Sequence, residues 1–366
     1  MSGLIKSLLL CGAASFLLAG SAHGSPAEKE ADGRLLVIIS RTAKLETELP
    51  VDTGRWSRII GKSPVLAKQP EPVSDVYLEV EGRRYVVDPD FGLYEPGARV
   101  SVQLPGRMRS ELKGYLTLLR SVHYGELLSW PEATKILTMK SIFTVTDLES
   151  GLQFAVQRRA GSTHADVQPL TKKDTAVMKL IYNGKWTWKR RAILVSKDGY
   201  RLAASMHGMP HGGDGIPGND FSGHFCIHFL GSSTHKTRSV DHDHQVMVHK
   251  AAGRLPDFVR GASPEELASL FFTAINQKDR ELMAMLFPSR HHEQLPAMQH
   301  HVATITAARQ LTELPPAEDE GLLETERAVR ATIFWKEGGK EERRIVFRMR
   351  RAAPWQPWRM EHVEFG

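Results

Sequence analysis

The sequence predicts a β-rich protein that ends in an α+β unit. Short alternating runs bounded by glycine turns predict strands over about residues 33–105 and again over about 140–230. A helix-capping pattern and a helical apolar stripe follow near residue 263, and the chain then closes in strand-like runs. The composition, 41% hydrophobic and 25% charged, is that of a globular protein.

The first 24 residues are expected to form a secretory signal peptide. Lys6 gives a positive start, residues 8–18 are apolar, and Ala22-His23-Gly24 offers a small-residue cleavage site. The apolar run is short for a bilayer span and has no stop-transfer flank, so export with cleavage is favoured over a membrane anchor. We therefore expect a periplasmic or secreted protein that meets the membrane only through this segment.

Residues 33–105 are predicted to form a small β-rich domain. Residues 35–40 resemble a strand, residues 76–87 a β-hairpin that turns at Glu81-Gly82-Arg83, and residues 100–104 another short strand. Residues 106–128 follow as a helical connector, because apolar side chains recur there at helical spacing. This part of the chain shows no motif to which chemistry can be attached.

Residues 129–255 are predicted to form a second β-rich domain, and the one that carries the chemistry. Residues 192–196 and 200–205 flank Asp198-Gly199, a strong signal for a two-residue hairpin. A glycine-rich stretch then leads to a strand at 224–229. Asp241 and the residues after it are expected to cap a helix whose polar face is exposed.

Residues 262–366 are predicted to form an α+β domain. Ser263-Pro264-Glu265-Glu266 is a capping box with proline at the first helical position. A second helix is expected at 280–287, followed by strands at 329–336, 343–350 and 358–363. Helices followed by an antiparallel meander resemble the order of elements in NTF2-like domains.

Cys226 is the most informative residue, because no second cysteine remains once the segment that contains Cys11 is removed. A leftover cysteine in an exported chain pairs with another molecule, is a small buried hydrophobe, or is a reactive thiol. Residues 224–229 alternate, so His224, Cys226 and His228 share one face of a strand and the aromatic and aliphatic residues share the other.

Two further histidines precede this strand. His207 and His211 lie across the glycine-rich stretch, and either imidazole could fold over Cys226. A nearby histidine activates a cysteine nucleophile by accepting its proton or by lowering the pKa of the thiol.

His207, a spacer of 15 residues, and the run Gly223-His224-Phe225-Cys226-Ile227-His228 together resemble the signature of the YkuD-type L,D-transpeptidases. That signature is a histidine, about fourteen to seventeen residues, then Ser/Thr-His-Gly-Cys, one residue, and Arg or Asn. Gly223, Phe225 and His228 depart from it. The resemblance covers about residues 140–250.

The resemblance implies a cysteine that attacks a peptidoglycan stem peptide, forms a thioester and passes the acyl group to an amine or to water. Cys226 would be the nucleophile, His207 the base with His211 in reserve, and His224 a residue that shapes the pocket. His228 stands where arginine is usual. The partner implied is a peptidoglycan peptide, with no cofactor and no metal. The oligomeric state is not predicted.

Two alternatives remain open. Eight of the 16 histidines lie between residues 207 and 249, and His164-Ala165-Asp166 could add ligands, which would suit a zinc-dependent envelope peptidase. A non-catalytic protein that binds envelope glycan or peptide is the other. The net charge of +6 is mild for this length and does not indicate nucleic-acid binding.

Overall fold

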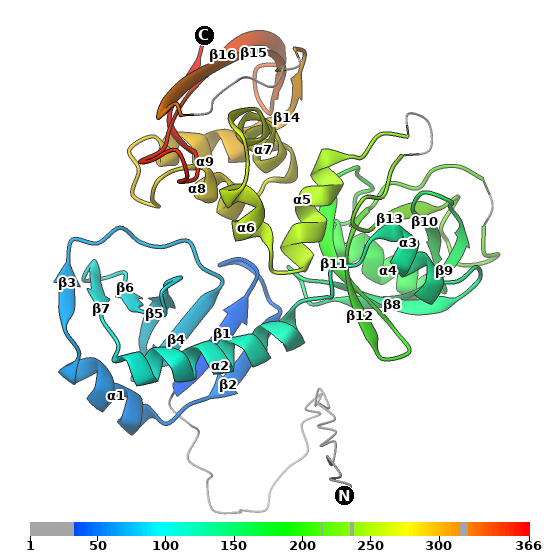
Figure 1. The fold of residues 1–366 in the computed structure, drawn as a ribbon. Helices are drawn as coiled ribbons and strands as arrows, with labels where there is room; N and C mark the ends of the chain where they lie inside the picture. Colours follow the sequence, from blue (N-terminus) through cyan, green and yellow to red (C-terminus); the bar gives the residue numbers. More distant parts are fainter. Residues whose placement is uncertain (1–32, 214, 235–237, 313, 315–320) are drawn as a thin grey trace, which may run out of the picture. The chain divides into compact units, whose positions relative to one another are not determined.

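The computed structural model describes residues 33–213, 215–234, 238–312, 314 and 321–366 (Figure 1). The expected signal peptide at 1–24 and His235 lie outside these residues. The described chain is β-rich, as the sequence predicts, and it contains antiparallel sheets and a closed barrel. None of the described helices is long and apolar enough to cross a membrane.

The N-terminal part is an antiparallel sheet in which strands β2-β1-β4-β5-β6-β7-β3 are neighbours in that order. The predicted hairpin at 76–87 is confirmed, and Glu81 and Gly82 adopt positive φ at its turn. Helix α2 lies where the sequence predicts a helical connector, and it packs along β1 and β2 (Figure 1). The bounds are β1 (Gly33–Ile38), β2 (Glu46–Pro50), α1 (Thr53–Lys62), β3 (Val65–Ala67), β4 (Val76–Val80), β5 (Arg83–Val87), β6 (Leu93–Glu95), β7 (Val100–Val102) and α2 (Gly106–His123).

The middle part is a closed barrel of strands in the order β10-β13-β12-β11-β8-β9. The predicted hairpin at Asp198-Gly199 joins β11 to β12, and each barrel strand runs antiparallel to its neighbours. Apolar side chains from all six strands fill the interior. The bounds are α3 (Trp130–Ile136), β8 (Ile142–Asp147), β9 (Gln153–Ala160), β10 (Ala165–Pro169), α4 (Lys172–Ile181), β11 (Arg190–Lys197), β12 (Tyr200–His207), β13 (Phe225–His228), α5 (His242–Ala251) and α6 (Leu255–Arg260).

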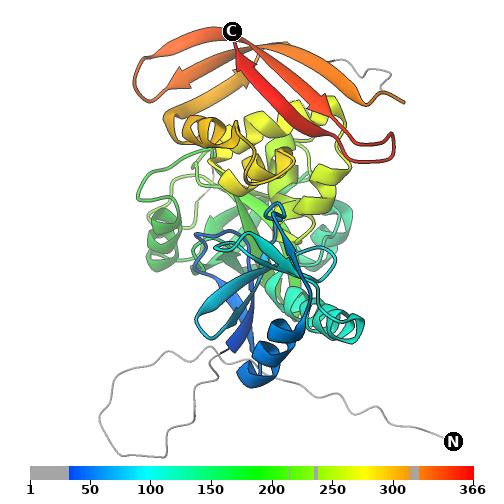
Figure 2. The ribbon, with the colours of Figure 1, turned by 90° about the vertical axis from the view of Figure 1, so that its left-hand side faces the viewer.

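The C-terminal part is a four-stranded antiparallel sheet with helices packed against one of its faces (Figure 2). The predicted capping box is present, because the Ser263 hydroxyl accepts from the Glu266 amide while the Glu266 carboxylate accepts from the Ser263 amide. The bounds are α7 (Pro264–Gln277), α8 (Arg280–Leu286), α9 (Leu295–Thr304), β14 (Ile305–Gln310), β15 (Glu324–Trp335), β16 (Lys340–Arg350) and β17 (Arg359–Phe365).

Candidate functional site

Cys226 lies on the outer face of barrel strand β13, which pairs with β10 on one side and β12 on the other. Phe225 and Ile227 point into the barrel core, so the strict alternation of the strand turns Cys226 and His228 outward. This outward face is covered as well, since Cys226 is only 5% exposed and His228 only 3%. The thiol therefore lies beneath a layer of polar side chains.

The loop after β12 folds back over the thiol and is anchored by two backbone hydrogen bonds. The amide of His211 donates to the carbonyl of His224, and the amide of His224 donates to the carbonyl of His211. Gly223 has φ of +87°, and a Cβ there would lie 2.4 Å from the His211 carbonyl oxygen. An L-residue would be strained at this position, so glycine allows the close approach of the two backbone segments.

His211 presents an unprotonated ring nitrogen to the thiol. Its Nδ1 lies 3.0 Å from the carbonyl oxygen of Met209, which can only accept, so Nδ1 carries the proton. Nε2 then holds a lone pair, and it lies 3.3 Å from Sγ of Cys226. Burial lowers the pKa of His211, and burial together with the Asp166 carboxylate raises the pKa of Cys226. The resting pair is thus a neutral imidazole and a neutral thiol.

His207 lies close to the same thiol, but its Nδ1 accepts a hydrogen bond, whereas Nδ1 of His211 donates one. The backbone amide of Met209 donates to its Nδ1 at 3.3 Å, which leaves the ring proton on Nε2. The exposed Trp188 ring packs against both His207 and His211. His207 itself is buried, and burial lowers its pKa strongly.

Asp166 adds a carboxylate to the cluster from the neighbouring strand, in register with Cys226. Its Oδ1 lies 3.1 Å from Nε2 of His164, 3.7 Å from Nε2 of His224 and 3.7 Å from Sγ of Cys226. The sequence offered His164 and Asp166 only as optional ligands, since nothing local brings β10 beside β13.

Three imidazoles form a parallel stack beside the thiol. The rings of His164 and His228 are 4.5 Å apart, and those of His228 and His244 are 3.8 Å apart. Burial lowers the pKa of His228 to about 3 and that of His244 well below its ordinary value, so these two rings are neutral at pH 7.

Asp241 does cap helix α5, as predicted, but the prediction of an exposed polar face was wrong for His244. That ring is buried and lies 2.9 Å from the Ser205 hydroxyl, because α5 packs this side against the barrel. His244 and Trp188 are therefore members of the cluster that the sequence did not reveal.

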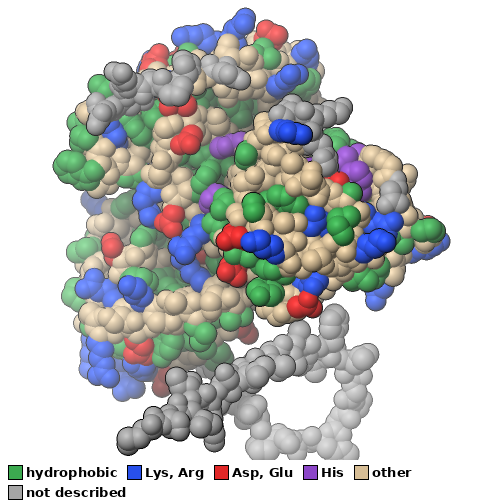
Figure 3. Space-filling view, turned by 45° about the vertical axis from the view of Figure 1, so that its right-hand side comes forward, with side chains coloured by type: hydrophobic (Ala, Val, Ile, Leu, Met, Phe, Trp, Pro, Cys, Tyr) green, Lys and Arg blue, Asp and Glu red, His purple; other side chains and the backbone are tan. Residues whose placement is uncertain are grey.

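All five histidine and cysteine residues predicted for the site come together. Sγ of Cys226 lies within 4.8 Å of ring nitrogens of His207 and His211, of His228, and of His224. Within the cluster, His211 and His224 are only partly buried. Figure 3 shows histidine side chains in small patches on one face of the molecule.

The cluster thus combines a thiol, an acceptor nitrogen 3.3 Å from it, and further imidazoles in a largely dry setting. This arrangement suits nucleophilic catalysis by cysteine and also offers ligands for a thiophilic metal. No protein-family model matches the chain, and a search of curated proteins finds no match.

Proposed function

We propose that the protein is an exported cysteine acyltransferase or hydrolase that acts on peptidoglycan stem peptides. The observation that carries the proposal is the contact between Sγ of Cys226 and Nε2 of His211, with the proton of His211 fixed on Nδ1 by Met209. A nucleophile within hydrogen-bond reach of a base that a third group orients is the pattern of covalent catalysis.

The chemistry follows from the protonation states of the two side chains. As Sγ attacks the carbonyl carbon of the substrate amide, the thiol proton passes to Nε2 of His211. The resulting imidazolium returns that proton to the leaving amine as the C–N bond breaks, which leaves an acyl thioester on Cys226. An amine or a water then loses a proton to Nε2, attacks the thioester carbon and releases the thiol.

The hydrogen bonds favour His211 over His207 as the base. His207 would have to give up the bond from the Met209 amide, or present a nitrogen that already holds a proton. The choice of substrate depends on the resemblance to YkuD-type L,D-transpeptidases and on the expected signal peptide. In the same proposal, residues 129–255 are the YkuD-like domain, and residues 262–366, with helices followed by a four-stranded sheet, are NTF2-like.

The test is acylation of Cys226 by a carbapenem, which the resemblance implies will form a stable thioester. Intact mass of the reduced full chain, incubated with the carbapenem in the presence of a chelator, is expected to show a single adduct that Cys226→Ala abolishes. Muropeptide digests then show whether the acyl group passes to an amine or to water. An unmodified wild-type chain that turns over no muropeptide would contradict the proposal and favour a non-catalytic binding protein.

A further inference from the structure

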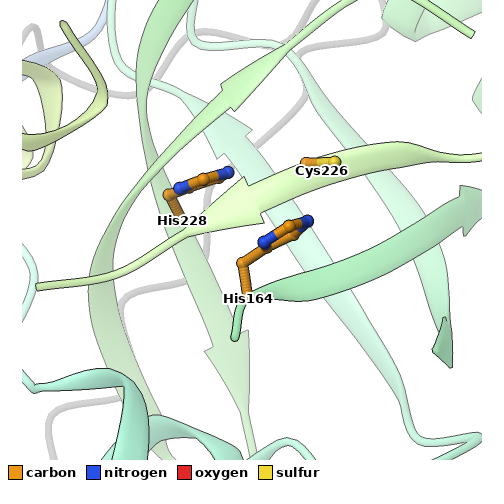
Figure 4. A group of neighbouring side chains, drawn as sticks. All are labelled: His164, Cys226 and His228. Atoms are coloured by element: carbon orange, nitrogen blue, oxygen red, sulfur yellow. The ribbon is translucent and has the colours of Figure 1, made fainter. Parts of the chain in front are cut away.

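Two buried histidines other than His211 converge on the thiol of Cys226. Figure 4 shows Cys226 and His228 on β13 and His164 just before β10, with ring nitrogens of both histidines directed toward the sulfur. One donor atom from each lies within 4.8 Å of the other two, and all three residues are at most 5% exposed. Two imidazoles and one thiolate form a ligand set that zinc favours.

The hydrogen bond of His164 orients it as a ligand. Its Nδ1 lies 2.7 Å from the carbonyl oxygen of Ser233, so Nδ1 is the donor and Nε2 is the nitrogen that would bind a metal. Nε2 lies 3.1 Å from Oδ1 of Asp166. Two electron-rich atoms at this distance repel unless a positive charge, either a proton or a metal ion, lies with them.

His228 can act as a second histidine ligand. Its Nδ1 is buried and has no hydrogen-bond partner among the residues that the structure describes. No bond to Nδ1 therefore dictates which nitrogen carries the proton, and the nitrogen directed at the sulfur can offer its lone pair. A neutral imidazole is the form that binds a metal.

We propose that Cys226, His164 and His228 form a binding site for a borderline-soft divalent cation, with Zn²⁺ as the natural occupant. Donor atoms around a tetrahedral zinc lie roughly 3.5 Å apart, so the site would tighten by about 1 Å on binding. Asp166 and His211 also lie beside the thiol. This site uses the thiol of the proposed catalytic pair, but it does not depend on acyl transfer, because a metal-bound sulfur is not available as the nucleophile.

A second possible set, Cys226 with His207 and His211, is less suitable. The Met209 amide occupies the lone pair on Nδ1 of His207, and this leaves a proton on Nε2. Binding there would break that bond, whereas Nδ1 of His164 keeps its bond to the Ser233 carbonyl when the other ring nitrogen acts as the ligand. Variants of the two sets therefore separate the alternatives.

The experiment is titration of the full chain, reduced and stripped with chelator, with Co²⁺ and then with Zn²⁺ as competitor. One equivalent of Co²⁺ is expected to give tetrahedral absorption bands with a thiolate charge-transfer band, and Zn²⁺ is expected to displace it. His164→Gln and Cys226→Ser are expected to bind at least ~100-fold more weakly. His249→Gln, a partly buried histidine of α5 outside the cluster, serves as the matched control and should bind like the wild type.

Two results would overturn the proposed metal site. One is the absence of a thiolate charge-transfer band at saturating Co²⁺, and the other is a His164→Gln variant that binds Co²⁺ as tightly as the control. If a buried variant does not fold, the wild-type chain decides, because one equivalent of Zn²⁺ should slow alkylation of Cys226 at least ~10-fold and an unchanged rate contradicts the proposal. His211→Gln should still bind Co²⁺ although it loses acylation in chelator, so failure of one proposal is distinguishable from failure of the other.

Discussion

Gly223 provides a direct test of how the loop holds His211 over the thiol. Replacing it with alanine introduces two costs. An L-residue in the left-handed region loses about 1–2 kcal/mol, and a Cβ 2.4 Å from the His211 carbonyl oxygen forces the backbone apart at a further cost of about 1–3 kcal/mol. We therefore expect Gly223→Ala to lower the free energy of unfolding by about 3 kcal/mol and to slow carbapenem acylation of Cys226.

The matched control is Gly218→Ala in the same loop. Gly218 has φ of +76°, but a Cβ there meets nothing within 4 Å, so only the conformational cost of about 1–2 kcal/mol applies. Urea unfolding of both variants isolates the steric contribution as their difference. Equal destabilisation of the two variants would refute the close approach of residue 223 to the His211 carbonyl.

Three further predictions test other parts of the account. His211→Gln should slow acylation of Cys226 by about 10²–10⁴-fold and His207→Gln by much less, as measured by time-resolved intact mass; the reverse order would make His207 the base. Burial lowers the pKa of His123 to about 4 from about 6.5 in the unfolded chain, so its contribution to stability is complete above about pH 6.5 and is lost as the pH falls toward 4. Between about pH 7.5 and about pH 4.5, the free energy of unfolding measured in urea should therefore fall by about 2.5 kcal/mol less in His123→Gln than in the wild type. An equal fall in the two proteins would contradict this role of His123. Asp279→Asn keeps the N-cap of α8 but removes the charge 2.6 Å from the buried Nζ of Lys250, so it should cost about 3 kcal/mol in the same assay, while the exposed Asp257→Asn should cost little.

Local signals predicted much of the fold. The Asp198-Gly199 turn, the capping box at Ser263 and the alternation at residues 224–229 each depend on neighbours in the chain, and each is found where it was expected. Barrel closure was not predictable in this way, because β10 pairs with β13 across about 60 residues and no periodicity encodes that register.

The residues of the candidate site were predictable from the sequence only in part. His207, His211, His224, Cys226 and His228 could be named because a spacing and an alternation join them within one stretch of chain. His244 was placed on an exposed helix face, since the sequence does not show which side of α5 packs against the barrel. The tautomers that separate His211 from His207 depend on the backbone of Met209, which only the folded loop positions.

The most direct test of the central claim, that Cys226 is a catalytic nucleophile served by His211, is the intact mass of the reduced, chelator-treated chain after incubation with a carbapenem. The account predicts one covalent adduct on the wild-type chain, its absence in Cys226→Ala, and strongly slowed formation in His211→Gln but not in His249→Gln. A folded wild-type chain that stays unmodified, or an adduct that persists in Cys226→Ala, would contradict it.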